Sequence, residues 1–416
     1  MRAPHPRYRL YTSWRSYLPF AIDLIRIEED GDAVRRFEEA LTAFLGTDRV
    51  ATLPMCRTGI YLTVKHLVRP GQEVVMSPYT IADVINMVIL AGGRPVFADI
   101  ERETCNISAA SVRSLVHAGT GAVLVTHLHG IPAPIREIRD LCEELGVPVI
   151  EDAAQAFGAR VDGERLGTIG DAGVYSFGTY KNINAWYGGA VTCRNPETFA
   201  AIRGELSRSS PQSGAFLIKR MLKGLVTDLA TNPILFRALT YWIIRFGQLH
   251  EIRAINRFVE EERDLNRRDR VPAEYLGRMT AAQHRLCLTQ LGHVDRDNRS
   301  RAEKAALYRS GLQETDAFVL PPGDCGDSIY TYFPIQRGDS LEERRLLLRF
   351  LAQHGCDVGP QHLKNCADLP AFREFHRDCP NARKTAASVV LLPSYPAYPV
   401  GDIERNLALL RRYRPD

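Results

Sequence analysis

The sequence predicts an α/β protein with a mostly parallel central sheet flanked by helices, a helical insertion and a smaller C-terminal α+β domain. Three observations support this prediction. From residue 32 to residue 195, short β-branched runs alternate with amphipathic helical stretches. Glycine and proline mark the changes between them. The 416 residues also exceed the usual size of one hydrophobic core, so more than one domain is expected.

The expected strands are short apolar runs bounded by turn-forming residues. They are Glu73–Met76, Arg94–Ala98, Ala122–Val125, Val147–Ile150, Gly173–Ser176 and Ala190–Thr192. Helical spacing of apolar residues predicts helices over Ala33–Leu45, Gly59–Leu67, Ile81–Ala91, Ser108–Ala118 and Pro134–Leu145. Gly146, directly after the last of these helices, predicts a left-handed cap. Strands that alternate with helices in this way form parallel sheets.

The pattern changes beyond residue 201. Long helical periodicity over Ile202–Arg270, with a Ser/Pro/Gly loop at Ser207–Gly214, predicts a helical insertion. One long helix is expected over Arg278–Tyr308. The strands and helix of the small domain are expected at Asp327–Arg337, Leu341–His354 and Val389–Leu392. The chain should therefore divide into an N-terminal arm (1–31), a large domain (32–201), the insertion (202–270) and the long helix with the small domain (271–416).

Composition and charge exclude several classes of protein. The formal net charge is only +4, with arginine and glutamate interspersed, so nucleic acid is not an expected partner. The nine cysteines form no Cys-x-x-Cys pair, which indicates neither a zinc site nor a disulfide framework. The segment Met1–Trp14 lacks the apolar core of a signal peptide. We expect a cytoplasmic protein without a metal site.

The first chemical signal is the run Glu-Asp-Ala-Ala-Gln that ends at Gln155. Asp152 stands just past the carboxyl end of an apolar strand, where open α/β sheets place ligand-binding groups. Gln155 would share its face if a helical turn begins there. Taken alone, such an aspartate is more often a helix cap. Its meaning therefore depends on the residues that accompany it.

The second signal is a lysine beside another strand end. Ser176 closes a strand, and Lys181 follows in a short loop before the Gly188–Gly189 pair. Lysine is rare in this chain, which otherwise uses arginine for positive charge. A lysine at this position therefore indicates a role for an amine that can lose its proton.

Together these residues predict a site for pyridoxal 5'-phosphate. The cofactor needs an amine for a Schiff base, a carboxylate for its protonated pyridine nitrogen, and donors for its phosphate. Lys181 and Asp152 supply the first two. Thr58 and Gly59 begin a predicted helix whose N-terminal amides can hold an anion. The combination is much more specific than any single member.

Several ordered motifs accompany these residues across most of the chain. They are Arg57-Thr-Gly-Ile-Tyr-Leu62, Pro70-Gly-Gln-Glu-Val-Val75, Gly92-Gly-Arg-Pro-Val-Phe-Ala-Asp99, His127-Leu-His-Gly130, Ser176-Phe-x-x-x-Lys-Asn-Ile183, Arg278-Met-Thr-Ala-Ala-Gln283 and Cys379-Pro-Asn-Ala-Arg383. In this order they resemble the DegT/DnrJ/EryC1/StrS sugar aminotransferases, which are pyridoxal-phosphate enzymes of fold type I. The resemblance implies that fold, that cofactor and a homodimer.

The resemblance also implies roles for individual residues. Lys181 would bond covalently to the cofactor and move the substrate proton. Asp152 would pair with the pyridine nitrogen, and Gln155 would bind near the ring hydroxyl. Ser176, Thr58 and Gly59 would hold the phosphate.

Some positions depart from the family pattern or stay open. The aromatic residue that stacks on the cofactor ring in many relatives falls at Ile81, so either Ile81 packs there or Tyr79 supplies the ring. His362 falls where relatives often have a histidine near the substrate, with an ordinary loop histidine as the equal alternative. For His129, as for the neighbouring His127, a buried structural role is favoured over one in substrate binding.

The implied reaction is transfer of an amino group to a ketone. By resemblance, the acceptor is a nucleotide-linked deoxysugar or a related secondary-metabolite ketone, and L-glutamate is the usual donor. Some dehydratases of the family have histidine in place of the lysine, so Lys181 favours transamination. A dehydratase or epimerase of the same family, or a non-catalytic regulatory protein with the same fold, are the alternatives.

The insertion carries an amphipathic pattern of its own. Apolar residues from Phe216 to Leu225 alternate with Lys219, Arg220 and Lys223. Ile234–Leu249 is interrupted by arginines and is too short to span a bilayer, so a buried or interfacial helix is expected. A dimer or domain contact explains residues 216–249 more simply than contact with a membrane surface, although a basic amphipathic helix can bind one.

Overall fold

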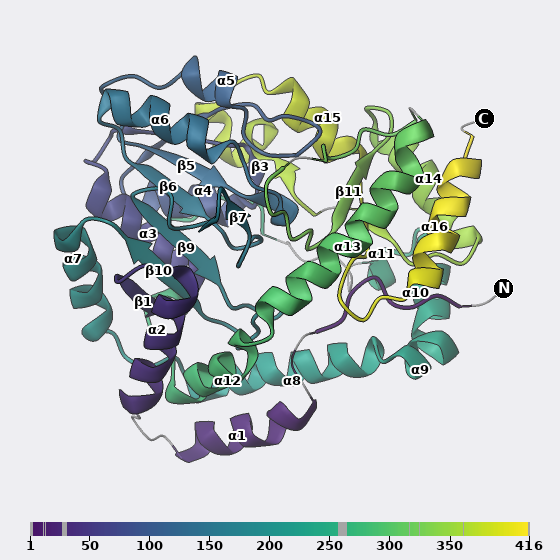
Figure 1. The fold of residues 1–416 in the computed structure, drawn as a ribbon, viewed down its shortest axis with the longest axis horizontal. Coiled ribbons are helices and arrows are strands. Elements are labelled where there is room, and N and C mark those ends of the chain that lie inside the picture. The colour runs from purple at the N-terminus through teal and green to yellow at the C-terminus, as the bar shows by residue number, and fades with distance from the viewer. Residues whose placement is uncertain are drawn as a thin grey trace.

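The computed structural model describes residues 3–414 of the protein except residues 11, 13, 27–30, 257–263, 316, 324 and 361. A seven-stranded sheet lies at its centre, in the order β1-β10-β9-β6-β5-β2-β4 (Figure 1). Its strands are β1 Val50–Leu53, β2 Glu73–Met76, β4 Arg94–Phe97, β5 Ala122–Thr126, β6 Val149–Asp152, β9 Ala172–Ser176 and β10 Gly189–Cys193. Residues 27–30 of the expected arm and 257–263 of the expected insertion lie outside the described residues.

The sheet is mostly parallel, as predicted. Strands β4, β2, β5, β6 and β9 run parallel to one another. Strand β10 is antiparallel to both of its neighbours. All six expected strands are present, with ends shifted by up to two residues, whereas β1 was not predicted. It is a four-residue strand that follows a helix almost directly, so the sequence offers little alternation by which to recognise it.

The helices of the large domain cover both faces of the sheet (Figure 1). They are α2 Gly31–Leu45, α3 Cys56–Leu67, α4 Ala82–Leu90, α5 Ala109–Arg113, α6 Ile135–Leu145 and α7 Pro196–Ser207. Gly146 caps α6 in the left-handed conformation, with φ of 67°, as predicted. The helix expected to reach Ala118 is wrong in length. It stops at Arg113, and the chain turns at His117, whose N–H donates to Thr120 Oγ1.

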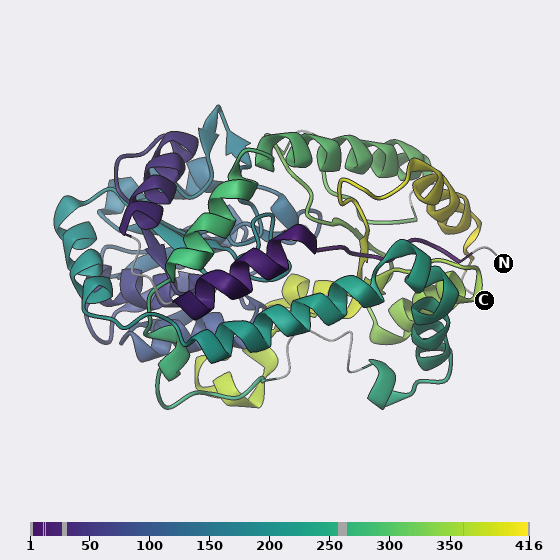
Figure 2. The ribbon, with the colours of Figure 1, turned by 90° about the horizontal axis from the view of Figure 1, so that it is seen from below.

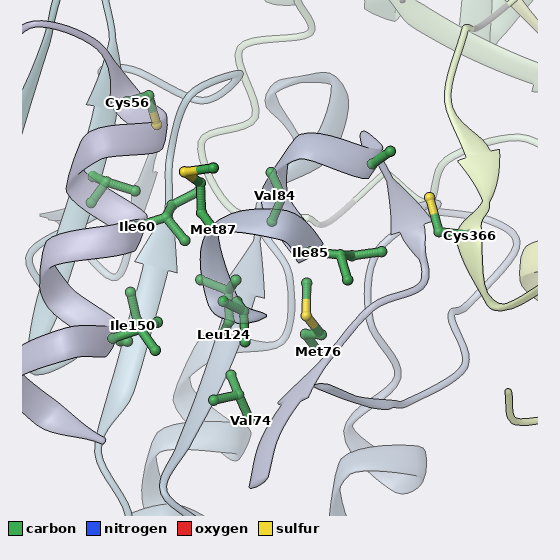
Figure 3. Close-up of a cluster of buried hydrophobic side chains, with 14 of the residues drawn as sticks. Cys56, Ile60, Val74, Met76, Val84, Ile85, Met87, Leu124, Ile150 and Cys366 are labelled. Carbon is green, nitrogen blue, oxygen red and sulfur yellow. The ribbon is translucent and has the colours of Figure 1, made fainter. Parts of the chain in front are cut away.

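The apolar core of the sheet fixes where the site can form. Figure 3 shows Ile60 of α3 and Met87 of α4 meeting Leu124 and Ile150 of the sheet. These four side chains are at most 1% exposed. The close packing holds the first turn of α3 against the ends of the strands.

The insertion consists of helices, as predicted. They are α8 Gly214–Ala230, α9 Pro233–Leu235, the π-helical turn η3 Phe236–Thr240, α10 Tyr241–Leu249 and α11 Arg253–Asn256. Helix α7 runs across the expected boundary at residue 202 and packs on α3 and β10. Figure 2 shows α8 beside α1, Tyr17–Arg26, which follows the short turn η1 Trp14–Ser16.

Trp186 anchors α8 and α1 to the large domain. Its side chain is fully buried, and its ring lies 4.9 Å from that of Tyr17. Gly224 of α8 lies directly against the indole, where a larger residue would overlap it. No helix in the described ranges is long and apolar enough to cross a membrane.

The single long helix expected over Arg278–Tyr308 is wrong. The chain forms two helices, α12 Ala281–Leu291 and α13 Val294–Leu312, separated at Gly292 and His293. Residues 278–280 precede the first helix because Thr280 caps it, accepting a hydrogen bond from Gln283 N–H. The change of direction lets α12 pack on α2, while α13 reaches α16 in the small domain.

The small domain is built on a three-stranded sheet of order β11-β14-β12. Its elements are β11 Phe333–Gln336, α14 Leu341–Gln353, β12 Gly359–Pro360, α15 Pro380–Ser388, β14 Val389–Leu392 and α16 Val400–Arg412. A short pair joins the domains, between β3 Tyr79–Thr80 and β13 Lys364–Asn365. The remaining elements are β7 Arg160–Val161, β8 Glu164–Arg165, η2 Leu128–Gly130, η4 Ala273–Tyr275, η5 Gln313–Thr315, η6 Cys366–Asp368 and η7 Pro370–Phe375.

Candidate active site

Asp152 is the last residue of β6 and is buried, with 4% of its surface exposed. Its Oδ1 accepts hydrogen bonds from Ala154 N–H at 3.0 Å and from the Cys56 thiol at 3.7 Å. Burial raises the pKa of the carboxyl, and the charge of Lys181 is among the opposing effects. A buried carboxylate of this kind is stabilised by a cation placed beside it.

Cys56 lies beside Asp152 and contacts its carboxylate. It is buried at the first position of α3, and burial raises the pKa of its thiol well above the usual value. The thiol is therefore protonated and unreactive at neutral pH. Its contact with Asp152 joins residues 96 positions apart and could not be read from the sequence.

Lys181 lies in the loop after β9, the strand directly beside β6 in the sheet. Its backbone N–H donates to the Gly178 carbonyl at 3.0 Å. The side chain is half-buried, and its charge acts on both Asp152 and Cys56. The structure thus brings together the lysine and the aspartate that the sequence singled out, at the carboxyl end of adjacent parallel strands.

The expected phosphate-binding residues lie around the same end of the sheet. Ser176 ends β9, and its Oγ accepts a hydrogen bond from Gly178 N–H at 3.4 Å. The Thr58 hydroxyl donates to the Tyr275 carbonyl at 2.6 Å, which leaves its oxygen free only to accept. At Gly59, an added Cβ would lie 2.7 Å from Leu53 and Val174, so this glycine permits α3 to approach the sheet.

The side chain of Gln155 is hydrogen-bonded to the backbone of His129. Gln155 Oε1 accepts a hydrogen bond from His129 N–H at 3.0 Å. His129 has a φ of 57°, and its buried ring nitrogens have no hydrogen-bond partner among the described residues. Burial, followed by the charge of nearby His362, lowers the pKa of His129 to about 3. His129 and His362, the two candidates for substrate binding, therefore lie close enough to influence each other.

The two candidates for the cofactor ring have different surroundings. Tyr79 is fully buried in the core, and burial raises its pKa well above the usual value. Among the charged or ionisable groups, Cys105 also raises the pKa of Tyr79 and Arg344 lowers it. Ile81, directly before α4, is half-buried at the edge of the same core. The exposed side of Ile81 makes it the better candidate of the two, and its contact with the ring stays a prediction.

A second group of charged residues near α3 was not singled out from the sequence. Asp83 of α4 accepts hydrogen bonds from Arg57 at 2.8 Å and from the Tyr275 hydroxyl at 2.6 Å, and also pairs with Arg268. Burial raises the pKa of Asp83, but the hydrogen bond from Arg268 and the other partners outweigh it and lower the pKa. This cluster holds the start of α3 against the loop that precedes α12.

The chemistry of these groups fits the predicted cofactor. A buried carboxyl with a raised pKa can stabilise a protonated pyridine nitrogen, and a half-buried amine stands beside it. No cluster of three or more metal-ligating side chains occurs in the part of the chain that the structure describes. The cysteines are all free thiols.

Curated relatives share part of the chain. GDP-perosamine synthase from Vibrio cholerae is 34% identical over 178 residues, which is 42% of this chain and 48% of that protein. The spore coat polysaccharide biosynthesis protein SpsC from Bacillus subtilis is 32% identical over 202 residues, covering 45% of this chain and 52% of that protein. The chain thus spans about half the length of the curated relatives it matches.

Solved structures match the fold along nearly the whole chain. The aminotransferase TlmJ from Streptoalloteichus hindustanus has a TM-score of 0.73 at 23% identity, covering 99% of this chain and 97% of that one. The sugar aminotransferase CalS13 from Micromonospora echinospora has a TM-score of 0.75 at 20% identity, covering 98% and 100%. A GDP-4-keto-6-deoxymannose-3-dehydratase has a TM-score of 0.73 at 16% identity, covering 98% and 100%.

The fold is therefore that of the fold-type I pyridoxal-phosphate enzymes, as predicted. The sequence profile of the DegT/DnrJ/EryC1/StrS aminotransferase family matches residues 23–222 and 243–410. Enzymes of this group depend on pyridoxal 5'-phosphate, and they include sugar aminotransferases and a related dehydratase. The chain belongs to the DegT/DnrJ/EryC1/StrS aminotransferase family.

Proposed function

We propose that this protein is an aminotransferase that converts the keto group of a nucleotide-linked deoxysugar, or of a related ketone, to an amine. L-Glutamate is the proposed amino donor. The observation that carries the proposal is the placement of Lys181 next to buried Asp152 at the ends of β9 and β6. Curated relatives named for perosamine and spore coat polysaccharide synthesis support a sugar as the acceptor.

Each residue of the proposed site has a separate task. Bound pyridoxal phosphate supplies an electron sink for the carbon that loses its proton. The Lys181 amine would move that proton between the substrate carbon and the cofactor carbon. Asp152 keeps the pyridine nitrogen protonated, and the Cys56 thiol holds the carboxylate in place by donating to Oδ1. Ser176 and the first amides of α3 would donate to the phosphate, and the Thr58 hydroxyl would join them by turning its proton from the Tyr275 carbonyl to a phosphate oxygen.

The other proposed contacts orient the bound molecules. Gln155, fixed by its hydrogen bond from His129 N–H, would bind near the ring hydroxyl. Ile81 would pack on one face of the ring. The imidazole of His129 and the nearby side chain of His362 would meet the substrate, where the buried, uncharged ring of His129 can accept or donate a hydrogen bond.

The first experiment is a chemical trap for Lys181. The holoenzyme is reduced with borohydride, and the modified peptide is located by mass spectrometry. We expect the cofactor on Lys181, and loss of the visible absorption band when glutamate is added before reduction. Lys181→Ala should lower the rate of this half-reaction by at least about 10²–10⁴-fold, because it removes the acid–base group.

Lys65→Ala is the matched control. Lys65 lies in the last turn of α3, at the opposite end of that helix from Thr58, and pairs with Glu205 at the surface, so the variant should keep both the adduct and the rate. A modified peptide without Lys181 would contradict the proposed mechanism. An adduct on Lys181 that ignores every amino donor would favour a dehydratase, an epimerase or a protein without turnover.

A further inference from the structure

A small cavity lies directly beside the loop of Lys181. Its volume is about 30 Å³, enough for about two groups of the size of a water molecule. Residues 7–9 of the N-terminal arm form one side of it. Tyr180 and Asn182, the chain neighbours of Lys181, form another side, and Thr331 of the small domain also lines it. The arm and both domains therefore meet at this cavity, next to the lysine that would react with the substrate.

Thr331 presents a buried hydroxyl group at this cavity. Its Oγ1 has no hydrogen-bond partner among the described residues. In a folded protein nearly every buried polar atom is hydrogen-bonded, because an unpaired hydroxyl group loses its contacts with water without replacement. A buried hydroxyl group that lines a cavity beside the proposed catalytic lysine is therefore placed to bond a ligand.

The backbone around Thr331 holds this hydroxyl group in position. Tyr330 has a φ of 45°, a left-handed conformation that is strained for an aromatic residue. The Ser394 hydroxyl donates to the Tyr330 carbonyl at 2.6 Å, and Thr331 N–H donates to the His129 carbonyl at 2.8 Å. Strained backbone persists where its surroundings fix it, and it is frequent at ligand sites. Thr331 is thus tied to His129, which already belongs to the proposed site.

Asn182 adds a hydrogen-bond acceptor to the wall of the cavity. Its Nδ2 donates to the Phe157 carbonyl at 3.3 Å and to Asn298 Oδ1 at 2.9 Å. Both amide hydrogens are thereby used, so only the carbonyl oxygen of Asn182 can bond a ligand. A ligand group that can donate a hydrogen bond is therefore favoured here over one that only accepts.

The two arginines of the arm do not make the cavity a site for an anion. Arg7 donates to Asp357 Oδ1 from Nε at 2.9 Å and from Nη2 at 2.5 Å. Arg9 donates to the Asp228 carbonyl at 3.2 Å, and its guanidinium lies 3.7 Å from the Asp228 carboxylate. Each positive charge has a carboxylate beside it, so neither arginine is left to balance the charge of a bound anion.

These features distinguish a hydroxyl group from a carboxylate. A hydroxyl group can accept from Thr331 and donate to Asn182, whereas a carboxylate only accepts and would meet the Asn182 oxygen unfavourably. The rings of Tyr8 and Tyr180, 5.4 Å apart, supply apolar surface for the C–H groups of a sugar ring. The cavity therefore suits a hydroxyl-bearing carbon and offers little to the carboxylates of an amino donor.

We infer that this cavity receives the hydroxyl-bearing carbon next to the keto group of the acceptor, and that Thr331 selects a hydroxylated ketone such as a sugar. The inference rests on the proposed function, because it concerns the acceptor of that reaction. It assigns Thr331 to the second half-reaction alone, since glutamate carries no hydroxyl group.

The test separates the two half-reactions. The holoenzyme is first treated with glutamate, which tests the proposed function by itself. Recovery of the visible absorption is then followed as a ketone takes up the amino group. The ketones are GDP- and dTDP-linked 4-keto-6-deoxyhexoses, each compared with its 3-deoxy counterpart, which lacks the hydroxyl group beside the ketone. Thr331→Val should lower the second-order rate constant for the hydroxylated ketone by about tenfold and leave that for the 3-deoxy ketone unchanged.

Two further variants serve as controls. Thr331→Ser keeps the hydroxyl group and should react nearly as fast as the wild type. Thr227→Val removes a hydroxyl group that donates to the Lys223 carbonyl within α8, and it should change neither half-reaction.

The outcomes distinguish this inference from the proposed function. Equal losses for both ketones in Thr331→Val, or no loss for either, would overturn the inference and leave the aminotransferase proposal intact. A slower reaction of Thr331→Val with glutamate would also overturn it, because the cavity would then serve the donor. A wild-type holoenzyme that reacts with glutamate but with none of the ketones would contradict the proposed acceptor and this inference together.

Discussion

Glu151 and Asp152 are consecutive acids with opposite surroundings. Because side chains alternate along a strand, they point to different faces of β6. Glu151 accepts hydrogen bonds from the N–H groups of Gly167, Ile169 and Gly170 and lies 3.1 Å from His127. Its task is therefore to hold the loop before β9, while Asp152 is left for a ligand. The favoured structural role of His127 agrees with this contact.

His129 makes the stability of the protein depend on pH. Its pKa falls from 6.5 to about 3 in the folded state, mainly because of burial. Below pH 6.5 the unfolded chain takes up a proton that the folded chain excludes, so acid favours unfolding. This residue should reduce the unfolding free energy by about 1.4 kcal/mol per pH unit between those two pKa values.

The variant His129→Asn isolates this effect, because asparagine tolerates the positive φ of this position. Urea unfolding of wild type and variant should be compared from neutral pH down to about pH 5. On acidification, we expect the unfolding free energy of the variant to fall less steeply than that of the wild type, by about 1.4 kcal/mol per pH unit. If the unfolding free energies of the two proteins had the same slope against pH, His129 would be hydrated or protonated in the folded protein.

At the scale of elements, local signals determined most of the fold. Strand β2 has the predicted bounds, and Gly146 ends α6 as expected, because alternation and a glycine cap act over a few residues. The break between α12 and α13 was missed because helical periodicity continues through Gly292. The degree to which α10 is exposed cannot be predicted from the sequence, for another reason. Apolar periodicity predicts a face and says nothing of whether another element covers it.

In the site, as in the fold, the sequence predicted the features that depend on local signals. Lys181 and Asp152 stood out because strand ends converge at one edge of a parallel sheet. The contact of Asp152 with Cys56, and the cluster of Arg57, Asp83 and Tyr275, depend on how α3 and α4 pack. The spacing of residues along the chain does not predict such long-range contacts.

Gly59 tests how closely α3 must approach the sheet. In Gly59→Ala the new methyl group would lie 2.7 Å from both Leu53 Cδ1 and Val174 Cγ1. Overpacking of this kind costs about 1–3 kcal/mol, against a gain of at most about 1 kcal/mol in helix propensity. We expect a net loss of unfolding free energy, measured by urea denaturation, and weaker cofactor binding as α3 shifts.

Gly204→Ala is the matched control. Gly204 lies in α7, and an added Cβ would have no neighbour within 4 Å. This variant should be stabilised by about 0.5–1 kcal/mol, because only the helix propensity changes. Equal effects of the two substitutions would show that α3 has room to accommodate a side chain at Gly59.

At the scale of the whole molecule, the N-terminal arm connects the separate parts. His5 bonds to Asp402 of α16 at 2.8 Å and to Arg237 of the insertion at 2.9 Å. The ring of Tyr8 packs 5.4 Å from that of Tyr180, the residue before Lys181. The arm therefore couples the small domain, the insertion and the loop of the proposed catalytic lysine.

The ion pair between Arg7 and Asp357 is the strongest of these links. Both residues are buried, and Arg7 donates to Asp357 from its backbone N–H at 2.7 Å and from Nε at 2.9 Å. Arg7→Ala would leave the carboxylate buried without its partner, which costs about 3–5 kcal/mol. The double variant Arg7→Ala with Asp357→Ala should recover a large part of that loss, since it removes the unpaired charge.

The exposed pair of Arg35 and Asp32 provides the comparison, because Arg35→Ala should cost at most about 1 kcal/mol. Thermal unfolding and urea titration of the wild type and the three variants, with the cofactor absorption followed in parallel, measure both stability and the integrity of the lysine loop. If the arm couples the domains, Arg7→Ala also broadens the transition or separates it into two. A single transition with an unchanged midpoint would show that the large and small domains are held together without the arm.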